Sequence, residues 1–456
     1  MSQYVADGSA PVLIEHYEQL VEFFAGACKP RQNWRIGTEY EKVAVWAATG
    51  QAVPFTGGIE EILRRLGERF PWEPIVEDGR IVALHDAQAS ITLEPGGQLE
   101  LSGQQCDSVH CARREFDEHV EQIVSVAEEL GIAFLGLGMQ PVSTLAEIEF
   151  VPKRRYRIMA PYMTRVGTLG QAMMKQTATV QVNIDYGSEA DAMLKLRAGM
   201  GLAPLFTAMF ANSPFCDGGL NGYLSYRAHI WTDTDADRCG LLPFMFERTA
   251  AFTDYIEYAL DVPMYFMVRD GHWTNMTSYT FRRFWKEGCN GERATLSDWE
   301  AHLTTLFPEA RMKGYIEMRS IDSQSPQLML AVPALVKGIF YDEDCLLAAW
   351  DMVKLWRLDE RNELADDVHR KALRARIRGI DVQELAKELL VIAESGLNRQ
   401  KSLNTYGESE ALYLEQLRDQ VRKGRCPADL LVEKWTGSWD REVSRMVAGS
   451  AYRVAA

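Results

Sequence analysis

Strict alternation of polar and apolar side chains in residues 177–185 constrains the fold more than any other feature of this chain. Ala178, Val180, Val182 and Ile184 fall on one face of the expected strand, and five polar residues fall on the other. Successive side chains of a strand point to opposite faces, so this period of two predicts a strand with one apolar and one polar side. Such alternation is typical of antiparallel sheets.

A second expected strand, residues 37–46, carries Glu39 and Glu41 side by side, and Val43 and Val45 follow on the same face. Tyr, Val and Trp in this stretch favour a pleated, partly buried surface. Two carboxylates that lead into an apolar row indicate the rim of a cleft that binds cations. Taken alone, a charged edge strand explains the pattern equally well.

Two further segments repeat this kind of polar face. Residues 90–102 predict a strand, a Gly-Gly turn or bulge and a second strand, and residues 315–319 predict another alternating strand. Together the four faces offer Glu39, Glu41, Glu94, Glu100, Gln181, Asn183, Glu317 and Arg319. Five carboxylates in one cleft repel one another unless cations or protons neutralise them. An all-oxygen ligand set suits Mg²⁺ or Mn²⁺ and not zinc or copper. The alternative is that these acids lie on unrelated surfaces.

Charge and composition narrow the possible partners. The 456 residues carry a formal net charge of -15, which disfavours a nucleic-acid partner. No apolar run approaches the ~20 residues that a membrane span requires, and the first residues lack the layout of a signal peptide. We therefore expect a cytoplasmic protein. Its eight cysteines include no C-x-x-C pair and are expected to be reduced thiols.

Several common catalytic motifs do not occur in the sequence: the phosphate-binding P-loop, the Gly-x-Ser-x-Gly elbow and His-Glu-x-x-His. Nucleotide binding would therefore use metal ions and basic side chains such as Lys153, Arg155 or Arg227. For the Lys153-Arg154-Arg155 triplet, a solvated loop is the alternative. Helices and strands alternate to about residue 325, and the chain is helical thereafter. We expect a catalytic part, residues 1–340, and a helical part, residues 341–456, packed on it.

A series of motifs, in order and over nearly the whole chain, resembles the glutamate–cysteine ligases of the plant and proteobacterial type. Leu-Glu-Pro-Gly-Gly-Gln at 93–98 is the most specific of them, and His-Ile-Trp-Thr-Asp-Thr-Asp at 229–235 is nearly as specific. The other matching segments are Gly37–Lys42, Thr179–Asn183, Phe210–Phe215, Asp261–Phe266 and Tyr315–Arg319.

This resemblance implies an ATP-dependent ligase that joins L-glutamate to L-cysteine through a γ-glutamyl phosphate, the first step of glutathione biosynthesis. It implies an α+β fold of the glutamine-synthetase type, in which a curved antiparallel sheet forms a funnel flanked by helices. Mg²⁺ or Mn²⁺ and ATP are the implied cofactor and cosubstrate. The expected partners are these small molecules, with no membrane and no nucleic acid, and the chain would be a monomer or homodimer.

The resemblance also assigns roles to individual residues. It implies metal binding by Glu39, Glu41, Glu94, Glu100, Gln181 and Glu317, substrate binding by Arg227, Trp231 and Tyr265, and catalysis by Arg319 and Glu317. To these we add, as expectations from the residues themselves, nucleotide binding by Lys153 and Arg155 and substrate binding by Asn183. Gln181 falls where some relatives place a metal-binding histidine, and glutamine is a weaker, neutral ligand. Arg319 falls where an arginine contacts phosphate.

The sequence departs from the plant pattern in two places. Plant members carry a cysteine pair that acts as a redox switch in a hairpin near residues 272–290, whereas this chain has Cys289 with Asn275 near the position of the partner. We therefore do not expect that switch. The N-terminal plastid extension of plant members does not occur in this sequence, which favours a bacterial-type cytoplasmic enzyme. Two alternatives remain: a γ-glutamyl ligase with another amine acceptor, and an inactive relative that binds glutamate.

Overall fold

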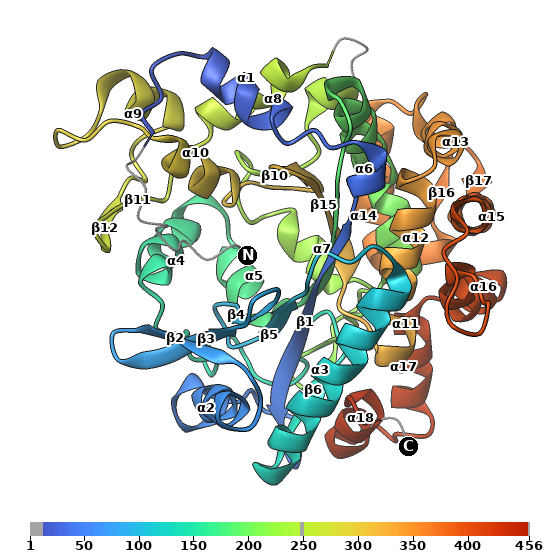
Figure 1. Ribbon diagram of the computed structural model, residues 1–456. Coiled ribbons are helices and arrows are strands. Elements are labelled where there is room, and N and C mark those ends of the chain that lie inside the picture. Colours follow the sequence, from blue (N-terminus) through green and yellow to red (C-terminus); the bar gives the residue numbers. More distant parts are fainter. Residues whose placement is uncertain (1–11, 247–249, 455–456) are drawn as a thin grey trace.

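A curved antiparallel sheet forms the centre of the protein in the computed structural model, which describes residues 12–246 and 250–454 (Figure 1). The strands lie in the order β14 (Ala310–Met312), β15 (Ile316–Asp322), β7 (Thr179–Ile184), β1 (Ile36–Trp46), β5 (Leu99–Ser102), β4 (Ser90–Leu93), β3 (Arg80–His85) and β2 (Glu73–Glu77). β6 (Ile132–Leu135) pairs with the end of β1. Figure 1 shows the sheet bending from the steep β1 and β15 to the flatter β2 and β3.

Four two-stranded ribbons lie outside this sheet. Their strands are β8 (Phe215–Cys216) with β9 (Gly219–Leu220), β10 (Cys239–Gly240) with β13 (Phe307–Pro308), β11 (Phe266–Arg269) with β12 (His272–Asn275), and β16 (Arg376–Ile377) with β17 (Ile380–Asp381). The last ribbon lies within the part expected to be entirely helical. Its turn places Arg378 and Gly379 at positive φ, and each strand is too short to show a period of two.

Helices cover both sides of the sheet. In the first part of the chain they are α1 (Glu18–Ala25), α2 (Glu60–Arg69), α3 (Val109–Glu129), α4 (Arg154–Val166), α5 (Gly170–Gln176), α6 (Glu189–Phe210), α7 (Tyr226–Trp231), α8 (Phe252–Asp261), α9 (Phe281–Glu287) and α10 (Leu296–Leu303). The later helices are α11 (Pro326–Met329), α12 (Ala331–Phe340), α13 (Glu343–Val353), α14 (Leu358–Lys371), α15 (Val382–Gln400), α16 (Glu415–Arg422), α17 (Pro427–Thr436) and α18 (Val443–Ser450). None of the described helices is both long and apolar enough to cross a bilayer.

The expected two-faced strand is β7. Its apolar residues Val180, Val182 and Ile184 are fully buried against the helical layer that includes α12. The polar face is covered as well, because Gln181 is only 5% exposed. The polar residues therefore line an enclosed site and do not form a solvated surface.

The helical C-terminal part is joined to the rest by a buried ion pair. Lys337 on α12 contacts Glu410, which lies in a short 3₁₀ turn, with an Nζ–Oε2 distance of 2.7 Å. Glu410 also accepts a hydrogen bond from the backbone N–H of Val109 at the first turn of α3. A carboxylate at a helix N-terminus satisfies an orphan N–H and complements the helix dipole. One side chain from the C-terminal part thus holds the start of a helix that lies against β1 and β6.

Candidate active site

Three carboxylates meet beside the centre of the sheet. Glu41, Glu94 and Glu100 each offer one oxygen, and these oxygens all lie within 4.8 Å of one another. Glu41 and Glu100 are directly paired across β1 and β5, so their side chains share a face. Glu94 reaches the same point from the turn between β4 and β5. Of the five acids expected to converge, these three form the tight group.

The Glu-Pro-Gly-Gly-Gln motif forms the turn that presents Glu94. The N–H of Gly97 donates to the Glu94 carbonyl, and the N–H of Glu94 donates to the Gln98 carbonyl, both at 2.9 Å. Gly97 has a φ of +85°, a left-handed conformation that favours glycine. Gly96 packs against α5 so closely that an added Cβ would lie 2.1 Å from the Lys175 carbonyl oxygen. Both glycines are therefore required by the backbone path that orients Glu94.

Two members of the trio, Glu41 and Glu94, are in an electrostatically unfavourable environment. Burial raises the pKa of Glu41 well above its usual value, and repulsion from Glu94 and Glu100 raises it further. Burial and the charge of Glu100 raise the pKa of Glu94 in the same way. A divalent cation would remove this penalty, and the three carboxylates supply the oxygen ligands that Mg²⁺ and Mn²⁺ prefer. The residues present thus fit such an ion.

Glu39 lies next to this trio but is held differently. Its two carboxylate oxygens accept hydrogen bonds from the side-chain amides of Gln181, at 3.1 Å, and Asn183, at 3.0 Å. Glu39 is paired with Gln181 across β1 and β7, which explains why the polar faces of these two strands meet. The amides orient the carboxylate without neutralising its charge.

Glu317 lies in a network of three cations. Its oxygens are 2.6 Å from Arg311, 3.1 Å from Lys313 and 2.5 Å from Arg319. Burial alone would raise the pKa of Glu317, but attraction to these three cations outweighs burial and holds the pKa well below its usual range. The five acids therefore divide into the trio, in which Glu41 and Glu94 have raised pKa values, an amide-bound Glu39 and a salt-bridged Glu317.

Arg311 and Lys313 were not identified from the sequence. Arg311 lies on β14 directly opposite Glu317, and Lys313 follows at the turn into β15. β14 has three residues, too few for a periodic pattern. The available signal was Gly314 between two short polar segments, which is a common feature of a hairpin turn.

Arg319 connects the network to a small cavity. Its Nη1 donates to Gln181 and Glu317, and its guanidinium lies 5.8 Å from the Trp231 ring and 5.5 Å from the Phe307 ring. Arg227, Trp231 and Arg319 line a cavity of about 20 Å³, which has room for about one water molecule. Trp231 Nε1–H is a buried donor without a hydrogen-bond partner among the described residues.

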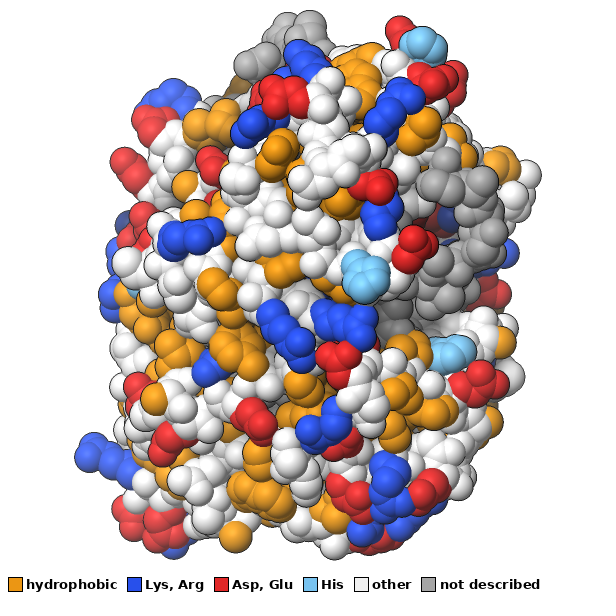
Figure 2. All heavy atoms as spheres, turned by 90° about the vertical axis from the view of Figure 1, so that its left-hand side faces the viewer, with side chains coloured by type: hydrophobic (Ala, Val, Ile, Leu, Met, Phe, Trp, Pro, Cys, Tyr) orange, Lys and Arg blue, Asp and Glu red, His pale blue; other side chains and the backbone are white. Residues whose placement is uncertain are grey.

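The basic triplet is divided between the surface and the site. Arg154 is held at the surface by Asp78, with an Nη2–Oδ1 distance of 2.6 Å, and by the Gly271 carbonyl. Figure 2 shows this side of the molecule, where acidic and basic side chains are interspersed. Lys153 is buried, and its Nζ donates to the Leu93 carbonyl next to Glu94. Burial lowers the pKa of Lys153 to about 8.

Arg155 is the inward-facing arginine of the triplet. Its charge acts on Glu94 and lowers the pKa of that acid against the effect of burial. Its Nε and Nη2 are buried and have no hydrogen-bond partner among the described residues. An unsatisfied buried guanidinium is costly, so this position fits an anionic ligand.

Tyr265 lies in a separate buried cluster. Its ring packs edge-on against Tyr162, with the centroids 5.2 Å apart, and the Arg238 guanidinium lies 4.1 Å from its centroid. Its hydroxyl lies 3.7 Å from the Met163 sulfur. These contacts do not bring Tyr265 together with the carboxylates.

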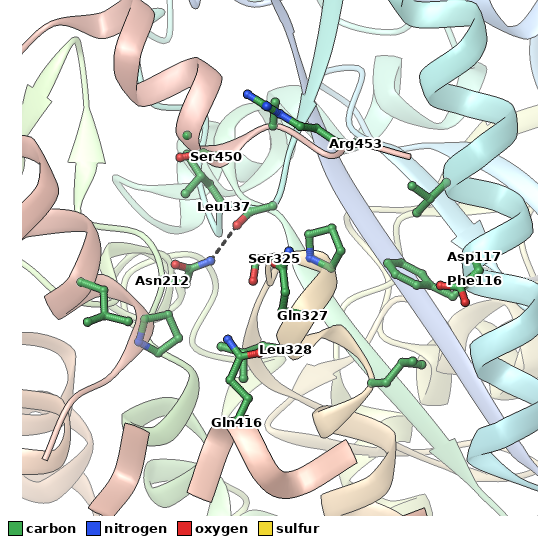
Figure 3. Close-up of a pocket in the computed structure, with 18 of the residues that line it drawn as sticks. Phe116, Asp117, Leu137, Asn212, Ser325, Gln327, Leu328, Gln416, Ser450 and Arg453 are labelled. Carbon is green, nitrogen blue, oxygen red and sulfur yellow. Dashed lines mark hydrogen bonds between the residues drawn. The ribbon is translucent and has the colours of Figure 1, made fainter. Parts of the chain in front are cut away.

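A larger cavity, of about 1360 Å³, lies between α3, α11 and the C-terminal helices (Figure 3). Phe116, which lines it, packs against Tyr40, whose side chain is on the face of β1 opposite Glu39 and Glu41. Figure 3 shows polar side chains such as Asn212 and Gln327 around this space, together with the charged Asp117 and Arg453, and no member of the acid trio lines it. It is thus distinct from the carboxylate site.

The expectation that all cysteines are reduced is wrong for one pair. Cys106 and Cys111 form a disulfide, with a Cα–Cα distance of 5.6 Å. Cys106 pairs with Ile36 by two backbone hydrogen bonds, and Cys111 lies in the first turn of α3. The chain reverses between them, so two cysteines five positions apart come within bonding distance. Cys289 is a free thiol.

Comparison with known proteins identifies the family of the chain. Residues 35–448 match the model of glutamate-cysteine ligase family 2 (GCS2). The chain is 44% identical over 429 residues to the chloroplastic glutamate–cysteine ligase of Brassica juncea, covering 93% of this chain and 82% of the relative. The same identity holds for the Arabidopsis thaliana protein, of which 81% is covered.

Solved structures resemble the fold at low sequence identity. A glutamate–cysteine ligase from Francisella tularensis in complex with AMP has a TM-score of 0.55 and 12% identity, covering 94% of this chain and 91% of that chain. A bifunctional glutathione synthetase from Pasteurella multocida has a TM-score of 0.54 and 12% identity, covering 95% and 53% of the two chains. These neighbours confirm the expected α+β fold with its curved antiparallel sheet.

The comparisons contradict the expected cytoplasmic location. The relatives from Brassica juncea, Medicago truncatula, Nicotiana tabacum and Arabidopsis thaliana are all named chloroplastic and none of these four is named cytoplasmic. The expectation was based on composition and the first residues, and neither property distinguishes a stromal protein from a cytoplasmic one. The family match extends over most of the chain and includes all strands of the central sheet. The chain therefore belongs to glutamate–cysteine ligase family 2.

Proposed function

We propose that this protein catalyses the ATP-dependent ligation of the L-glutamate γ-carboxylate to the amine of L-cysteine, the first step of glutathione biosynthesis. Family membership over residues 35–448 supports the reaction. The observation that carries the proposal for the site is the trio of the buried Glu41 and Glu100 and the half-buried Glu94, each with one oxygen within 4.8 Å of the others. The name of the Francisella tularensis structure, with its bound AMP, supports an adenine nucleotide as the cosubstrate.

The chemistry requires no protein nucleophile. An oxygen of the substrate γ-carboxylate attacks the γ-phosphorus of ATP, and ADP leaves. The cysteine amine then attacks the acyl carbon of the γ-glutamyl phosphate, loses a proton, and phosphate leaves. The enzyme must hold the reacting groups in line and stabilise the phosphoryl charge.

We assign metal binding to the acid trio first, with Glu39, Gln181 and Glu317 beside it. Bound Mg²⁺ or Mn²⁺ would neutralise phosphate charge during the transfer. Glu317 differs from the trio because three cations already occupy its surroundings. Its proposed catalytic role is therefore mainly to hold Arg319, and Gln181 supports Arg319 from the other side.

The basic side chains are assigned to the phosphates. Arg155 has buried donors near Glu94 that find no partner in the described part of the chain, and Lys153 lies beside the same acid. We propose that both contact the nucleotide. Arg319 lies on the other side of Gln181 and would stabilise the transferred phosphoryl group through the N–H groups that Glu317 and Gln181 leave available.

Arg227, Trp231 and Asn183 are proposed to bind the amino-acid substrates. Arg227 is buried, and burial lowers the pKa of its guanidinium against the opposing effect of Asp322 and Glu41. Trp231 presents an N–H that has no hydrogen-bond partner among the described residues. Tyr265 would contribute to this pocket indirectly, by packing on Arg238. Residues 1–340 would hold the whole site, and residues 341–456 would pack on it.

Turnover of the purified protein tests the proposal. ATP, Mg²⁺ and L-glutamate are supplied with L-cysteine or with other amines, and both phosphate release and the ligated product are measured. Cysteine-dependent formation of γ-glutamylcysteine is the expected result. Equal rates with bulky amines would indicate a ligase with another acceptor, and glutamate binding without phosphate release would indicate an inactive relative.

A further inference from the structure

Asp322 is a fully buried carboxylate at the end of β15 that receives four contacts. One oxygen, Oδ2, accepts hydrogen bonds from the Asn212 N–H at 2.8 Å and the Ser213 hydroxyl at 2.7 Å. The other, Oδ1, accepts from the Ser225 hydroxyl at 2.9 Å and lies 3.9 Å from Nη1 of Arg227. Its own side chain does not line the cavity that contains Arg227. Asp322 therefore contacts residues that hold Arg227 in place and does not line the cavity itself.

Asp322 fixes the direction of the O–H bonds of Ser213 and Ser225. Each hydroxyl has one proton, and both protons point to the carboxylate. The lone pairs of the hydroxyls are thereby free to accept. Ser213 Oγ accepts from the backbone N–H of Arg227 at 3.0 Å, and Ser225 Oγ accepts from the N–H of Ala228 at 3.2 Å.

These acceptors hold the first turn of α7. A helix of six residues is not stable by itself, because nucleation is costly and most of its N–H groups lack intrahelical partners. Ser225 is the N-cap residue of α7, a role worth about 1 kcal/mol in other helices. α7 carries Arg227 and Trp231, which line the small cavity with Arg319.

We propose that Asp322 is a positioning residue for amino-acid binding, which sets Arg227 in place through Ser213, Ser225 and the direct charge contact. The inference depends on the proposed function, because it assigns Arg227 to the substrate. Arg227 is further fixed by a hydrogen bond from its Nη2 to the Arg319 carbonyl at 2.9 Å. Asp322 thus connects the amino-acid pocket to the strand that carries Arg319 and Glu317.

Asparagine at position 322 would keep the size of the side chain and replace one acceptor with a donor. Its NH₂ group would face a serine hydroxyl and a second donor, either the Asn212 N–H or the Arg227 guanidinium. That hydroxyl would have to turn its proton away from residue 322, so its direction would no longer be fixed. In Asp322→Asn we expect the KM for glutamate or cysteine to rise about tenfold, as for the loss of one hydrogen bond to a charged group. The KM for ATP should change less than about twofold.

The control is Asp298→Asn. Asp298 is another buried aspartate that bonds a capping hydroxyl, Thr295, and an arginine, Arg269, at α10. We expect this variant to lower the melting temperature without changing the ratio of the KM values. A stability loss at Asp322 with no KM change, as at Asp298, would overturn the proposal.

A double variant distinguishes a role of Asp322 in positioning Arg227 from a general loss of structure. If Asp322 acts through Arg227, Asp322→Asn combined with Arg227→Lys should have the same amino-acid KM as Arg227→Lys alone, since coupled residues are not additive. Additive increases in the amino-acid KM would overturn the inference.

If Asp322→Asn does not fold, Ser213→Ala and Ser225→Ala give the same comparison. Unchanged amino-acid KM values in both variants would overturn the inference. Wild-type protein that forms no product would refute the proposed function before any variant is compared, and this inference with it.

Discussion

Arg311 and Glu317 face each other across β14 and β15, and their side chains form a fully buried ion pair with an Nη2–Oε2 distance of 2.6 Å. Lys313 and Arg319 contact the same carboxylate. A buried charge is tolerated only when it is paired and hydrogen-bonded. This network therefore explains why Glu317 can lie in the interior as an anion while nearby Glu41 and Glu94 have raised pKa values.

Removal of Arg311 should destabilise the protein. In Arg311→Met, Glu317 loses the cation that faces it across β14 and β15 but keeps Lys313 and Arg319, so we expect the free energy of unfolding to fall by about 3 kcal/mol, the lower end for a broken buried pair. Urea denaturation measures the change. Arg64→Met, which breaks an exposed pair with Glu61, is the control and should cost less than about 1 kcal/mol. Equal losses in the two variants would contradict the importance of this pair.

Several elements were predictable from the sequence because they are long enough to be periodic. The alternation in β7 and β1 gave the correct faces, and the register that brings Glu39 to Gln181 and Glu41 to Glu100 follows from antiparallel pairing. The sequence did not predict that Glu317 is salt-bridged whereas Glu41, Glu94 and Glu100 form a separate group. This division depends on Arg311, which lies on a strand of three residues without a pattern.

The disulfide was not predictable either. The Cys106–Cys111 contact depends on how the chain turns between β5 and α3, and spacing alone does not define that path.

Tyr265 shows that a recognised motif does not define the direction of a side chain. Its motif matches the family, but motif membership does not say whether a side chain faces the site or a neighbouring cluster, and Tyr265 packs on Arg238.

Metal binding should depend on the acid trio. Glu94→Gln keeps the shape of the side chain and removes one charge, so we expect affinity for Mn²⁺ to fall at least about tenfold, because a neutral oxygen is a weaker ligand for a hard cation. Electron paramagnetic resonance of free Mn²⁺ measures this without turnover. Glu149→Gln, at an exposed acid that bonds Thr56, is the control. An unchanged Mn²⁺ affinity in Glu94→Gln would place the ion elsewhere.

Arg319 should act on the chemical step. Arg319→Ala removes a cation assigned to the phosphoryl group and frees Glu317 from one partner, so we expect kcat to fall by roughly 10²-fold or more. The KM for ATP should change much less, because Lys153 and Arg155 are assigned to nucleotide binding. Steady-state kinetics at saturating Mg²⁺ distinguish the two parameters. A pure increase in the KM for ATP with normal kcat would contradict the assignment.

The disulfide should be visible by thiol counting. Denatured protein labelled without reductant should carry six adducts, and reduction first should raise the number to eight. Because the closed loop is short, Cys106→Ser together with Cys111→Ser should lower the free energy of unfolding by about 2 kcal/mol. The matched variant is Cys28→Ser with Cys289→Ser, at two free thiols. Eight adducts without reductant would show that the bond does not form.

Glu115 should make stability depend on pH. One of its oxygens accepts from the Gln104 N–H at 2.7 Å, and the other is buried without a partner among the described residues. Burial raises the pKa of Glu115 from 4.5 to about 7. Between these values the folded state holds a proton that the unfolded state has lost, so stability falls as the pH rises through this range, and the penalty stays above it.

Glu115→Gln keeps the acceptor and cannot ionise, so the variant should escape this penalty. We expect it to be more stable than the wild type at about pH 8, by at most about 3 kcal/mol, and nearly equal at about pH 5. Urea denaturation of both proteins at the two pH values measures the difference. Glu118→Gln, one turn along α3 and exposed, is the control and should show no such dependence. A Glu115→Gln variant whose advantage is the same at both pH values would show that packing, and not ionisation, is responsible.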